Sequence, residues 1–230
     1  MLRPGSRLPL VHGLHDGDRV VPGDVAFYVS GRLRSLLQAE RILLNIMQRM
    51  SGVATQTARY VKELEGLKTR VLDTRKTTPG MRVLDKMAVK LGGGENHRMG
   101  LFDMVILKDN HIDFAGGITA AVEQTKVYLE AKGKRIPIEV EVRSLDDVRE
   151  VLRLDGVDRI MLDNMGPQQL AEVLPLIPRD IEAEISGGVT LETIRDLALA
   201  SPLRPADFIS VGRITHSAPS ADFSMKMERG

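Results

Sequence analysis

The sequence contains no cysteine and no tryptophan, and aromatic residues make up only 3% of its 230 residues. Without cysteine, disulfides, thiolate nucleophiles and cysteine-based metal sites are excluded. So few aromatic side chains also argue against a stacking surface for single-stranded nucleic acid. These absences remove several kinds of chemistry before any motif is considered.

The sequence also lacks an excess of one charge and a long apolar run. Its 32 Lys and Arg residues nearly balance 31 Asp and Glu residues, which leaves a net charge of +1 at pH 7. No overall field therefore attracts nucleic acid or a membrane surface. No apolar stretch approaches the roughly 20 residues of a membrane span, and there is no signal-peptide pattern. We expect a cytoplasmic protein that binds neither nucleic acid nor membrane.

From residue 66 onward, short apolar strand patterns alternate with amphipathic helical patterns. The expected strands are Arg70–Asp73, Met104–Leu107, Ile138–Val142, Ile160–Leu162, Glu182–Ile185 and Phe208–Val211. The helical patterns between them are Val83–Leu91, Gly117–Ala131, Leu145–Leu154, Pro167–Leu176 and Leu191–Leu199. Such alternation predicts a parallel α/β sheet. About six units favour an open, TIM-like barrel over a doubly wound sheet, because no Gly-x-Gly-x-x-Gly follows the first strand.

The first 65 residues follow a different pattern. Turn signals dominate residues 1–24, with short strands expected at Val20-Val21 and Val25–Val29. These strands cannot form a core by themselves, so this opening reads as the end of a domain. A helical period of 3.6 then runs from Arg32 to Leu64, and Ser51-Gly52 is a candidate break between two helices.

Polar residues follow the expected strands rather than being scattered. The groups are Asp73-Thr74-Arg75-Lys76, Lys108-Asp109-Asn110-His111, Glu139 and Glu141 with Arg143, Asp163-Asn164, Ser186-Gly187-Gly188, and Gly212-Arg213. If the strands are parallel, all six groups gather at one rim, which is where barrel enzymes have their active sites.

The residue types indicate the ligand. Glu139 and Glu141 alternate along one strand, so both point to one face and need a cation, a metal or ribose hydroxyls nearby. Gly187-Gly188 and Gly212 suit a phosphate held on backbone N–H groups. The cations at the rim favour a ligand with several negative charges, such as a phosphate plus carboxylates; they are Arg75, Lys76, His97, Arg98 and Lys108. Metal binding through histidine is not expected, because the five histidines show no paired ligand spacing.

Taken together, these residues resemble quinolinate phosphoribosyltransferase, also called nicotinate-nucleotide pyrophosphorylase (carboxylating). The matching pieces are Glu40-Arg41 with Leu44-Asn45, Ser51-Gly52-Val53-Ala54-Thr55, Asp73–Gly80, Gly92–Arg98, Lys108–His111, Glu139–Val142, Leu162-Asp163-Asn164, Ser186-Gly187-Gly188 and Ser210–Ser217. They run in order from about Gly17 to the C-terminus. One departure is that the family normally has several dozen more residues before this start.

The resemblance implies an open α/β barrel with a small N-terminal α+β sandwich domain, which we expect to be truncated here. Residues 1–65 would form the sandwich remnant and connecting helices, 66–214 the barrel, and 215–230 a segment returning to the N-terminal domain. In a homodimer or larger assembly, the small domain of one subunit would cover the barrel mouth of its partner.

The resemblance also implies a reaction and a role for each site residue. Phosphoribosyl would pass from phosphoribosyl pyrophosphate to quinolinate with decarboxylation, giving nicotinate mononucleotide, pyrophosphate and CO2, with Mg²⁺ as cofactor. Arg41 would reach a quinolinate carboxylate in the partner's site. The remaining carboxylate charge would be held by Arg75, Arg98 and Lys108, with Lys76 and His97 beside them.

On the same likeness, Glu141 and Asp163 would face the ribose hydroxyls or the metal, and with Lys108 they form the expected catalytic set. The 5-phosphate would be bound by Ser186, Gly187, Gly188 and Gly212, with His216 near that end.

Three alternatives remain open at this point. Lys108 at a strand end could form a Schiff base, as in barrel lyases. A related pyrophosphorylase-like protein from a metal-transport operon shares the fold, although we would expect it to depart from the Arg75-Lys76 pattern. Finally, the short N-terminus could belong to a non-catalytic homologue.

Overall fold

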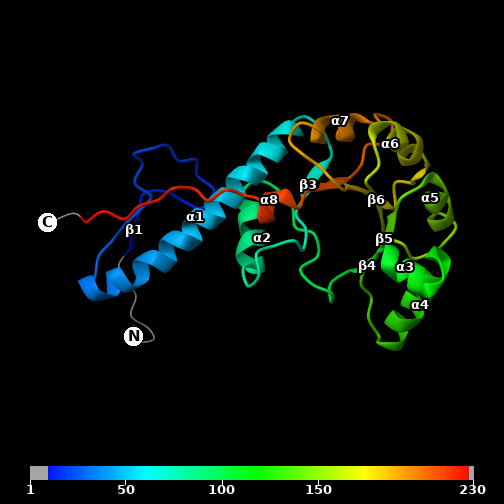
Figure 1. Cartoon of the computed structure of the whole chain (residues 1–230), viewed down its shortest axis with the longest axis horizontal. Coiled ribbons are helices and arrows are strands. Elements are labelled where there is room, and N and C mark those ends of the chain that lie inside the picture. Colours follow the sequence, from blue (N-terminus) through cyan, green and yellow to red (C-terminus); the bar gives the residue numbers. More distant parts are fainter. Residues whose placement is uncertain (1–9, 228–230) are drawn as a thin grey trace.

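The structure, a computed structural model, describes residues 10–227 and is built around one six-stranded parallel sheet (Figure 1). The sheet order is β3-β8-β7-β6-β5-β4. Its strands are β3 (Arg70–Leu72), β4 (Val105–Leu107), β5 (Ile138–Val142), β6 (Arg159–Asp163), β7 (Glu182–Ser186) and β8 (Phe208–Ser210). The predicted open barrel of about six parallel strands is confirmed, and each strand lies within two residues of its expected place.

The first two strands of the barrel, β3 and β4, lie at the two ends of the sheet order, which leaves the barrel open between them. The segment after helix α2 (Arg82–Leu91) runs along the free edge of β3. There the Glu95 amide donates to the Val71 carbonyl (2.8 Å) and the Asp73 amide donates to the Glu95 carbonyl (3.0 Å). This edge segment carries His97 and Arg98 into the barrel opening.

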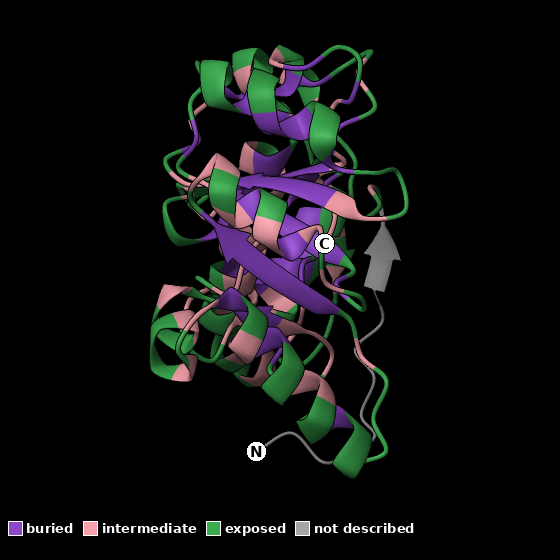
Figure 2. Ribbon diagram, turned by 90° about the vertical axis from the view of Figure 1, so that its right-hand side faces the viewer, coloured by how far each residue is buried: buried purple, intermediate pink, exposed green. Residues whose placement is uncertain are grey.

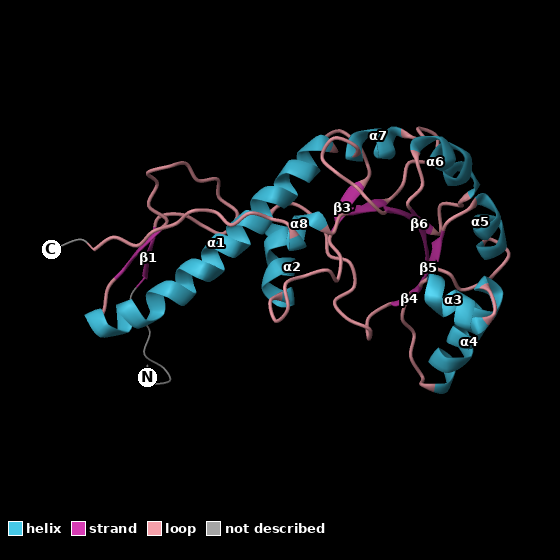
Figure 3. Cartoon of the chain, in the orientation of Figure 1, coloured by secondary structure: helices cyan, strands magenta, loops and turns pink. Residues whose placement is uncertain are grey.

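Helices cover the outer face of the strands (Figure 3). They are α3 (Asp109–Ala115), α4 (Ile118–Ala131), α5 (Leu145–Val151), α6 (Pro167–Val173) with the 3-10 turn η1 (Leu174–Leu176), and α7 (Ile194–Leu199). Figure 2 shows the strands buried while the outer sides of the helices are exposed. All five residues of β5 are buried. Its valines belong to the apolar core, whereas its alternate glutamates face the barrel interior.

The N-terminal region contains a two-stranded antiparallel sheet and one long helix. Strand β1 (Leu10–His12) pairs with β2 (Phe27–Val29), and helix α1 (Leu33–Glu63) then leads to the barrel. The expected strand at Val20-Val21 is wrong, because these residues form a loop. The expected break at Ser51-Gly52 is also wrong, since α1 continues through it.

The glycine at position 52 is explained by a tertiary contact and not by a break in the helix. A Cβ atom at Gly52 would collide with the carbonyl oxygen of Pro219, in the segment that follows the short helix α8 (Arg213–His216). This C-terminal segment runs back along α1, where the Ala221 amide donates to the Gln48 carbonyl (2.9 Å) (Figure 1). A glycine inside a helix costs only about 1 kcal/mol relative to alanine, so the close approach decides the residue.

Two short helices of the barrel, α3 and α8, were not predicted. Both start directly after a strand end, so Asp109, Asn110 and His111 lie in the first turn of α3. Among the described residues, no helix is long and apolar enough to cross a membrane.

Candidate active site

The carboxyl ends of the six strands bring most of the predicted site residues to one end of the barrel. Lys108, just after β4, donates from its ammonium group to Glu141 on β5 (2.7 Å). Arg143 lies 3.8 Å from the other oxygen of Glu141 and donates to Asp109 (2.6 Å). Glu141 is buried, so this rim carboxylate has the cationic partners that its position demands.

Two arginines at the rim carry unused donors. The Nε groups of Arg75 and Arg98 are both buried and have no hydrogen-bond partner in the described part of the chain. Burial, followed by the positive charge of Arg75, lowers the pKa of Arg98. A guanidinium group keeps its proton at physiological pH, so two such groups side by side repel each other. A bound anion would relieve that repulsion and take up the free N–H groups.

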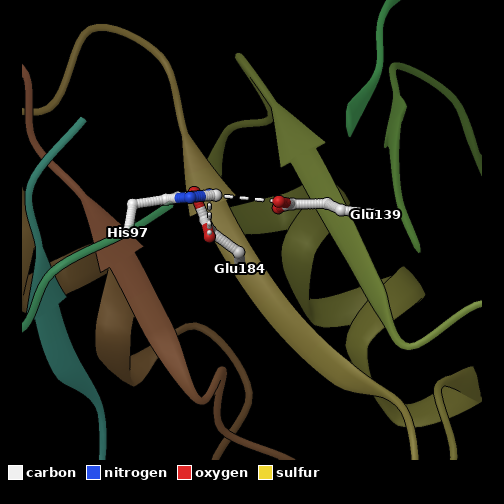
Figure 4. Close-up of side chains that lie close together, drawn as sticks. All are labelled: His97, Glu139 and Glu184. Atoms are coloured by element: carbon white, nitrogen blue, oxygen red, sulfur yellow. Dashed lines mark ion pairs between the residues drawn. The ribbon is translucent and has the colours of Figure 1, made fainter. Parts of the chain in front are cut away.

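One layer deeper, His97 meets two carboxylates inside the barrel (Figure 4). Its Nε2 atom lies 3.0 Å from Glu139 on β5 and 3.3 Å from Glu184 on β7. Although burial opposes the charge, these two carboxylates raise the pKa of His97 to about 9. His97 is therefore buried beside two carboxylates and is not one of the exposed contacts expected at the rim.

Glu184 was not singled out from the sequence, although a signal for it exists. It alternates with Ala183 and Ile185 as Glu139 does with Val140, which is the pattern of a polar residue facing a barrel interior. Its carboxylate accepts from Arg159 on β6 (3.1 Å). The same reasoning that selected Glu139 would have found it.

Asp73 belongs to the motif after β3 but does not face the rim. It is fully buried, where it pairs with Lys86 of α2 and accepts from the backbone N–H of His97 (2.8 Å). Lys86 in turn donates to the His97 carbonyl oxygen (2.9 Å). This buried pair therefore fixes the edge segment that carries His97 and Arg98.

A second buried acid, Asp85 of α2, fixes the turn that holds Arg75 and Lys76. It accepts two hydrogen bonds from Arg49 of α1 (3.0 and 3.2 Å) and one from the Thr78 amide (3.0 Å). Arg49 also donates to the Thr215 carbonyl (2.5 Å), and the Thr215 hydroxyl donates to the Lys76 carbonyl (3.0 Å). The turn after β3 is thereby tied to the last strand-to-helix loop.

Lys76, Gly212 and His216 consequently lie together. A Cβ atom on Gly212 would stand 3.2 Å from both His216 Nε2 and Lys76 Cδ. The backbone at Gly212 is thus approached by two potentially cationic side chains, as a phosphate site requires.

The loops after β6 and β7 are joined in the same way. The backbone N–H of Asn164 donates to the Ser186 carbonyl (2.9 Å), and the side-chain amide of Asn164 donates to the Asp163 carboxylate (2.7 Å). Gly187 has φ +95°, and a side chain there would collide with Asn164, whereas Gly188, at φ +59°, faces open space. Asp163 and the Ser186–Gly188 turn therefore form one wall of the rim.

Arg41 is not brought to the rim of its own barrel. It is exposed on α1, eight residues before Arg49, which corresponds to about 12 Å along the helix. Its expected role in a partner's site stays a prediction.

A large cavity lies away from this site. About 580 Å³ in volume, it lies near the amino end of β3, among Arg19, Lys62, Gly66, Arg70 and Glu95. None of the predicted site residues lines it. The predicted site is therefore formed by the residues at the strand ends and not by this cavity.

Comparison with known proteins agrees with the predicted resemblance. Residues 53–226 match the family model of the quinolinate phosphoribosyl transferase C-terminal domain, and residues 6–51 match that of the N-terminal domain. The chain is 44% identical over 227 residues to a chloroplastic nicotinate-nucleotide pyrophosphorylase [carboxylating] of Arabidopsis thaliana, covering 93% of this chain and 64% of that protein. It is 41% identical over 210 residues to a probable enzyme of that name from Bacillus subtilis, covering 91% of this chain and 70% of the relative.

Solved structures lead to the same family. NadC from Streptococcus pyogenes superimposes with a TM-score of 0.87 at 41% identity, covering 96% of this chain and 75% of that one. A nicotinate-nucleotide pyrophosphorylase from Francisella tularensis gives a TM-score of 0.85 at 37% identity, covering 94% and 74%. This chain thus spans less than two thirds of the length of the Arabidopsis relative and about three quarters of these structures. With both domain models matched and the fold shared, the chain belongs to the quinolinate phosphoribosyl transferase family.

Proposed function

We propose that this chain transfers phosphoribosyl from phosphoribosyl pyrophosphate to quinolinate and decarboxylates the product, as in NAD biosynthesis. One observation carries the proposal: the Nε groups of Arg75 and Arg98, two neighbouring cations at the rim, have no hydrogen-bond partner among residues 10–227. Two neighbouring guanidinium groups bind the carboxylates of a pyridine dicarboxylate more strongly than they bind a neutral ligand. The names of the relatives support this reading.

The donor would bind across the rim from the acceptor. Its 5-phosphate suits the backbone N–H groups around Gly187, Gly188 and Gly212, with Ser186 and His216 beside them. Lys76 adds a charge on the same side. Asp163 and Glu141 would then face the ribose.

The proposed chemistry needs position and charge but no protein nucleophile. The pyridine nitrogen attacks C1 of the ribose while the bond from C1 to the pyrophosphate oxygen breaks. Positive charge that develops on the ribose is stabilised by the carboxylates of Glu141 and Asp163. The bond from C2 of the ring to its carboxylate then breaks, and CO2 leaves. The electron pair stays at C2, next to the cationic ring nitrogen, and takes a proton from water.

Magnesium is part of the proposal, because carboxylate oxygens are its preferred protein ligands. Asp163 fits this role, since it is only half-buried and, within the described part of the chain, its carboxylate accepts a hydrogen bond from Asn164 alone. Glu141 fits less well, because Lys108 already occupies one of its oxygens. When bound, Mg²⁺ would offset charge on the departing pyrophosphate.

A homodimer or larger assembly in which Arg41 contacts the partner's ligand is also proposed, since Arg41 lies away from its own rim. Cytoplasmic location stays a prediction, because the names of some plant relatives specify chloroplasts or mitochondria.

The Schiff-base alternative is not favoured. Lys108 donates to Glu141 as an ammonium group in an ion pair, whereas a Schiff-base lysine needs a free lone pair on nitrogen. Borohydride trapping with a carbonyl substrate tests this directly, and a stable adduct on Lys108 would revive the lyase.

The proposed function is tested by following nicotinate mononucleotide formation from quinolinate, phosphoribosyl pyrophosphate and Mg²⁺. Nicotinate, which lacks the 2-carboxylate, is the control substrate. We expect turnover of quinolinate alone. A folded, dimeric protein without turnover would refute the proposal, so sedimentation accompanies the assay.

A further inference from the structure

The His97 side chain is held more firmly than any anion contact at the rim requires. Its Nε2 atom lies at ion-pair distance from both Glu139 and Glu184 (Figure 4). All three side chains are almost completely buried. Its backbone N–H and C=O are bound by Asp73 and Lys86. Strands β5 and β7, helix α2 and the end of β3 thus all fix one residue, for which the proposed reaction supplies no reason.

The charges around the imidazole favour its cationic form. Two buried carboxylates this close repel each other unless a positive charge lies between them. Arg159 pairs with Glu184 but not with Glu139, and Ser210 of β8 also faces Glu184. Both oxygens of Glu139 lack a hydrogen-bond partner among the described residues, and His97 is the cation at ion-pair distance from it there.

The imidazole also occupies a useful place relative to the rim. Glu139 precedes Glu141 by two residues on the same face of β5, a rise of about 6–7 Å. His97 therefore lies one layer of side chains below the Lys108–Glu141 pair. It is followed directly by Arg98, whose Nε is one of the free donors. A fixed positive charge at this place, away from water, attracts an anion bound at the rim, and the charged group does not have to change position when the anion binds.

We propose that Glu139 and Glu184 are positioning residues that hold His97 as an imidazolium cation beneath the dicarboxylate site. The effect on substrate rests on the proposed function, whereas the protonation of His97 does not. The raised pKa of His97 agrees with this arrangement. Quinolinate affinity should then decline as the pH rises through about 9.

Two competing arrangements define the test. Nδ1 of His97 lies 2.6 Å from the Arg98 amide, which would suit a neutral ring with its proton on Nε2. The ligating atoms of His97, Glu139 and Glu184 also lie within 4.8 Å of one another, close enough to surround a metal ion. A metal is disfavoured because His97 and Arg159 already offset the charge of the two carboxylates.

The deciding measurement is an NMR titration of the histidine side chains in the full chain without substrate, from pH 5.5 to 10. The His97 signal is assigned by its loss in His97→Gln. We expect a doubly protonated ring at pH 7.5 and a midpoint near 9, lowered by at least one pH unit in Glu139→Gln and in Glu184→Gln. Glu182→Gln is the matched control, because Glu182 pairs with Arg159 but not with His97.

A His97 midpoint near 6.5, or a neutral ring at pH 7.5, would overturn the inference, and so would stoichiometric metal that is lost in Glu184→Gln. If a glutamine variant fails to fold, the titration of the unsubstituted chain still decides. In the quinolinate assay, both glutamine variants should raise the KM for quinolinate at least tenfold while the KM for phosphoribosyl pyrophosphate stays within twofold. A chain without any turnover would refute the proposed function but leave the titration result standing.

Discussion

Arg159 lies inside the barrel and Arg98 at its rim, and their surroundings differ. Arg159, on β6, donates to Glu182 and Glu184 and stacks over Phe208 with its guanidinium carbon 4.5 Å from the ring centre. Although burial opposes it, the glutamates around Arg159 raise its pKa, whereas burial and Arg75 lower that of Arg98. All three guanidinium nitrogens of Arg159 donate to glutamates, which suits a residue that holds the fold together. Arg98 donates from Nη1 to the Met104 carbonyl (3.0 Å), but its Nε has no partner in the described part of the chain and it lies near a like charge, which suits a residue that binds a ligand.

This comparison predicts the largest loss of stability for Arg159→Met. Removing one partner of a buried ion pair leaves the other charge uncompensated, which costs about 3–5 kcal/mol. The free energy of unfolding in urea measures the effect. The control is Arg149→Met, which removes an exposed pair with Asp146 and should change stability by less than about 0.5 kcal/mol. If Arg159→Met lowers the free energy of unfolding no more than Arg149→Met does, Arg159 does not stabilise the fold as proposed.

Arg98→Met should show the opposite behaviour. Stability should change by less than about 1 kcal/mol, because the loss of the hydrogen bond from Arg98 Nη1 to the Met104 carbonyl (3.0 Å) is offset by the removal of repulsion from Arg75. Losing one charged partner of the dicarboxylate should lower kcat/KM for quinolinate about 10²–10³-fold, equivalent to roughly 3–4 kcal/mol. The KM for phosphoribosyl pyrophosphate is the internal control. Unchanged quinolinate kinetics would show that Arg98 does not bind the acceptor.

The layer around His97 should make stability depend on pH in a way that the rim arginines cannot. A histidine whose pKa rises on folding stabilises the protein fully below its unfolded value near 6.5, and this stability is lost as pH rises through about 9. At about 1.4 kcal/mol per pH unit, the loss is about 3 kcal/mol. Urea unfolding at pH 6, 7.5 and 9.5 should show this decline, and His97→Gln should remove it. Parallel curves for both proteins would contradict the assignment.

The contrast between the two arginines could not be predicted from the sequence. Apolar strands alternating with helices were enough to predict the parallel barrel and to place six polar groups at its carboxyl end. What distinguishes Arg159 from Arg98 is the set of partners that the sheet order brings beside each one. Those partners come from other strands, so neither arginine carries the difference in its own neighbourhood.

The errors at Ser51-Gly52 and at Asp73 have the same origin. Ser51-Gly52 has the local composition of a helix break, but the reason for Gly52 is the chain at Pro219, which passes against the helix. Asp73 reads as a rim acid by position, although Lys86 of the next helix pairs with it below the surface. Local patterns predict elements, whereas partners distant in sequence decide what each polar residue does.

The glycines of the proposed phosphate loop extend the comparison from side chains to the backbone. Gly187→Ala combines a positive φ of +95° with a collision against Asn164, whereas Gly188→Ala meets open space at φ +59°. We expect Gly188→Ala to cost about 1 kcal/mol of stability and Gly187→Ala roughly 1–3 kcal/mol more.

The two glycine variants also separate the loop from the rest of the rim. Because Gly187 lies against the residue that positions Asp163, its alanine variant should raise the KM for phosphoribosyl pyrophosphate at least tenfold more than Gly188→Ala does. The KM for quinolinate should stay nearly constant in both, since Arg75 and Arg98 come from other loops. Equal effects of the two variants would mean that Asn164 can move aside. The loop would then not be held in place before ligand binds, in contrast to Arg159 of β6.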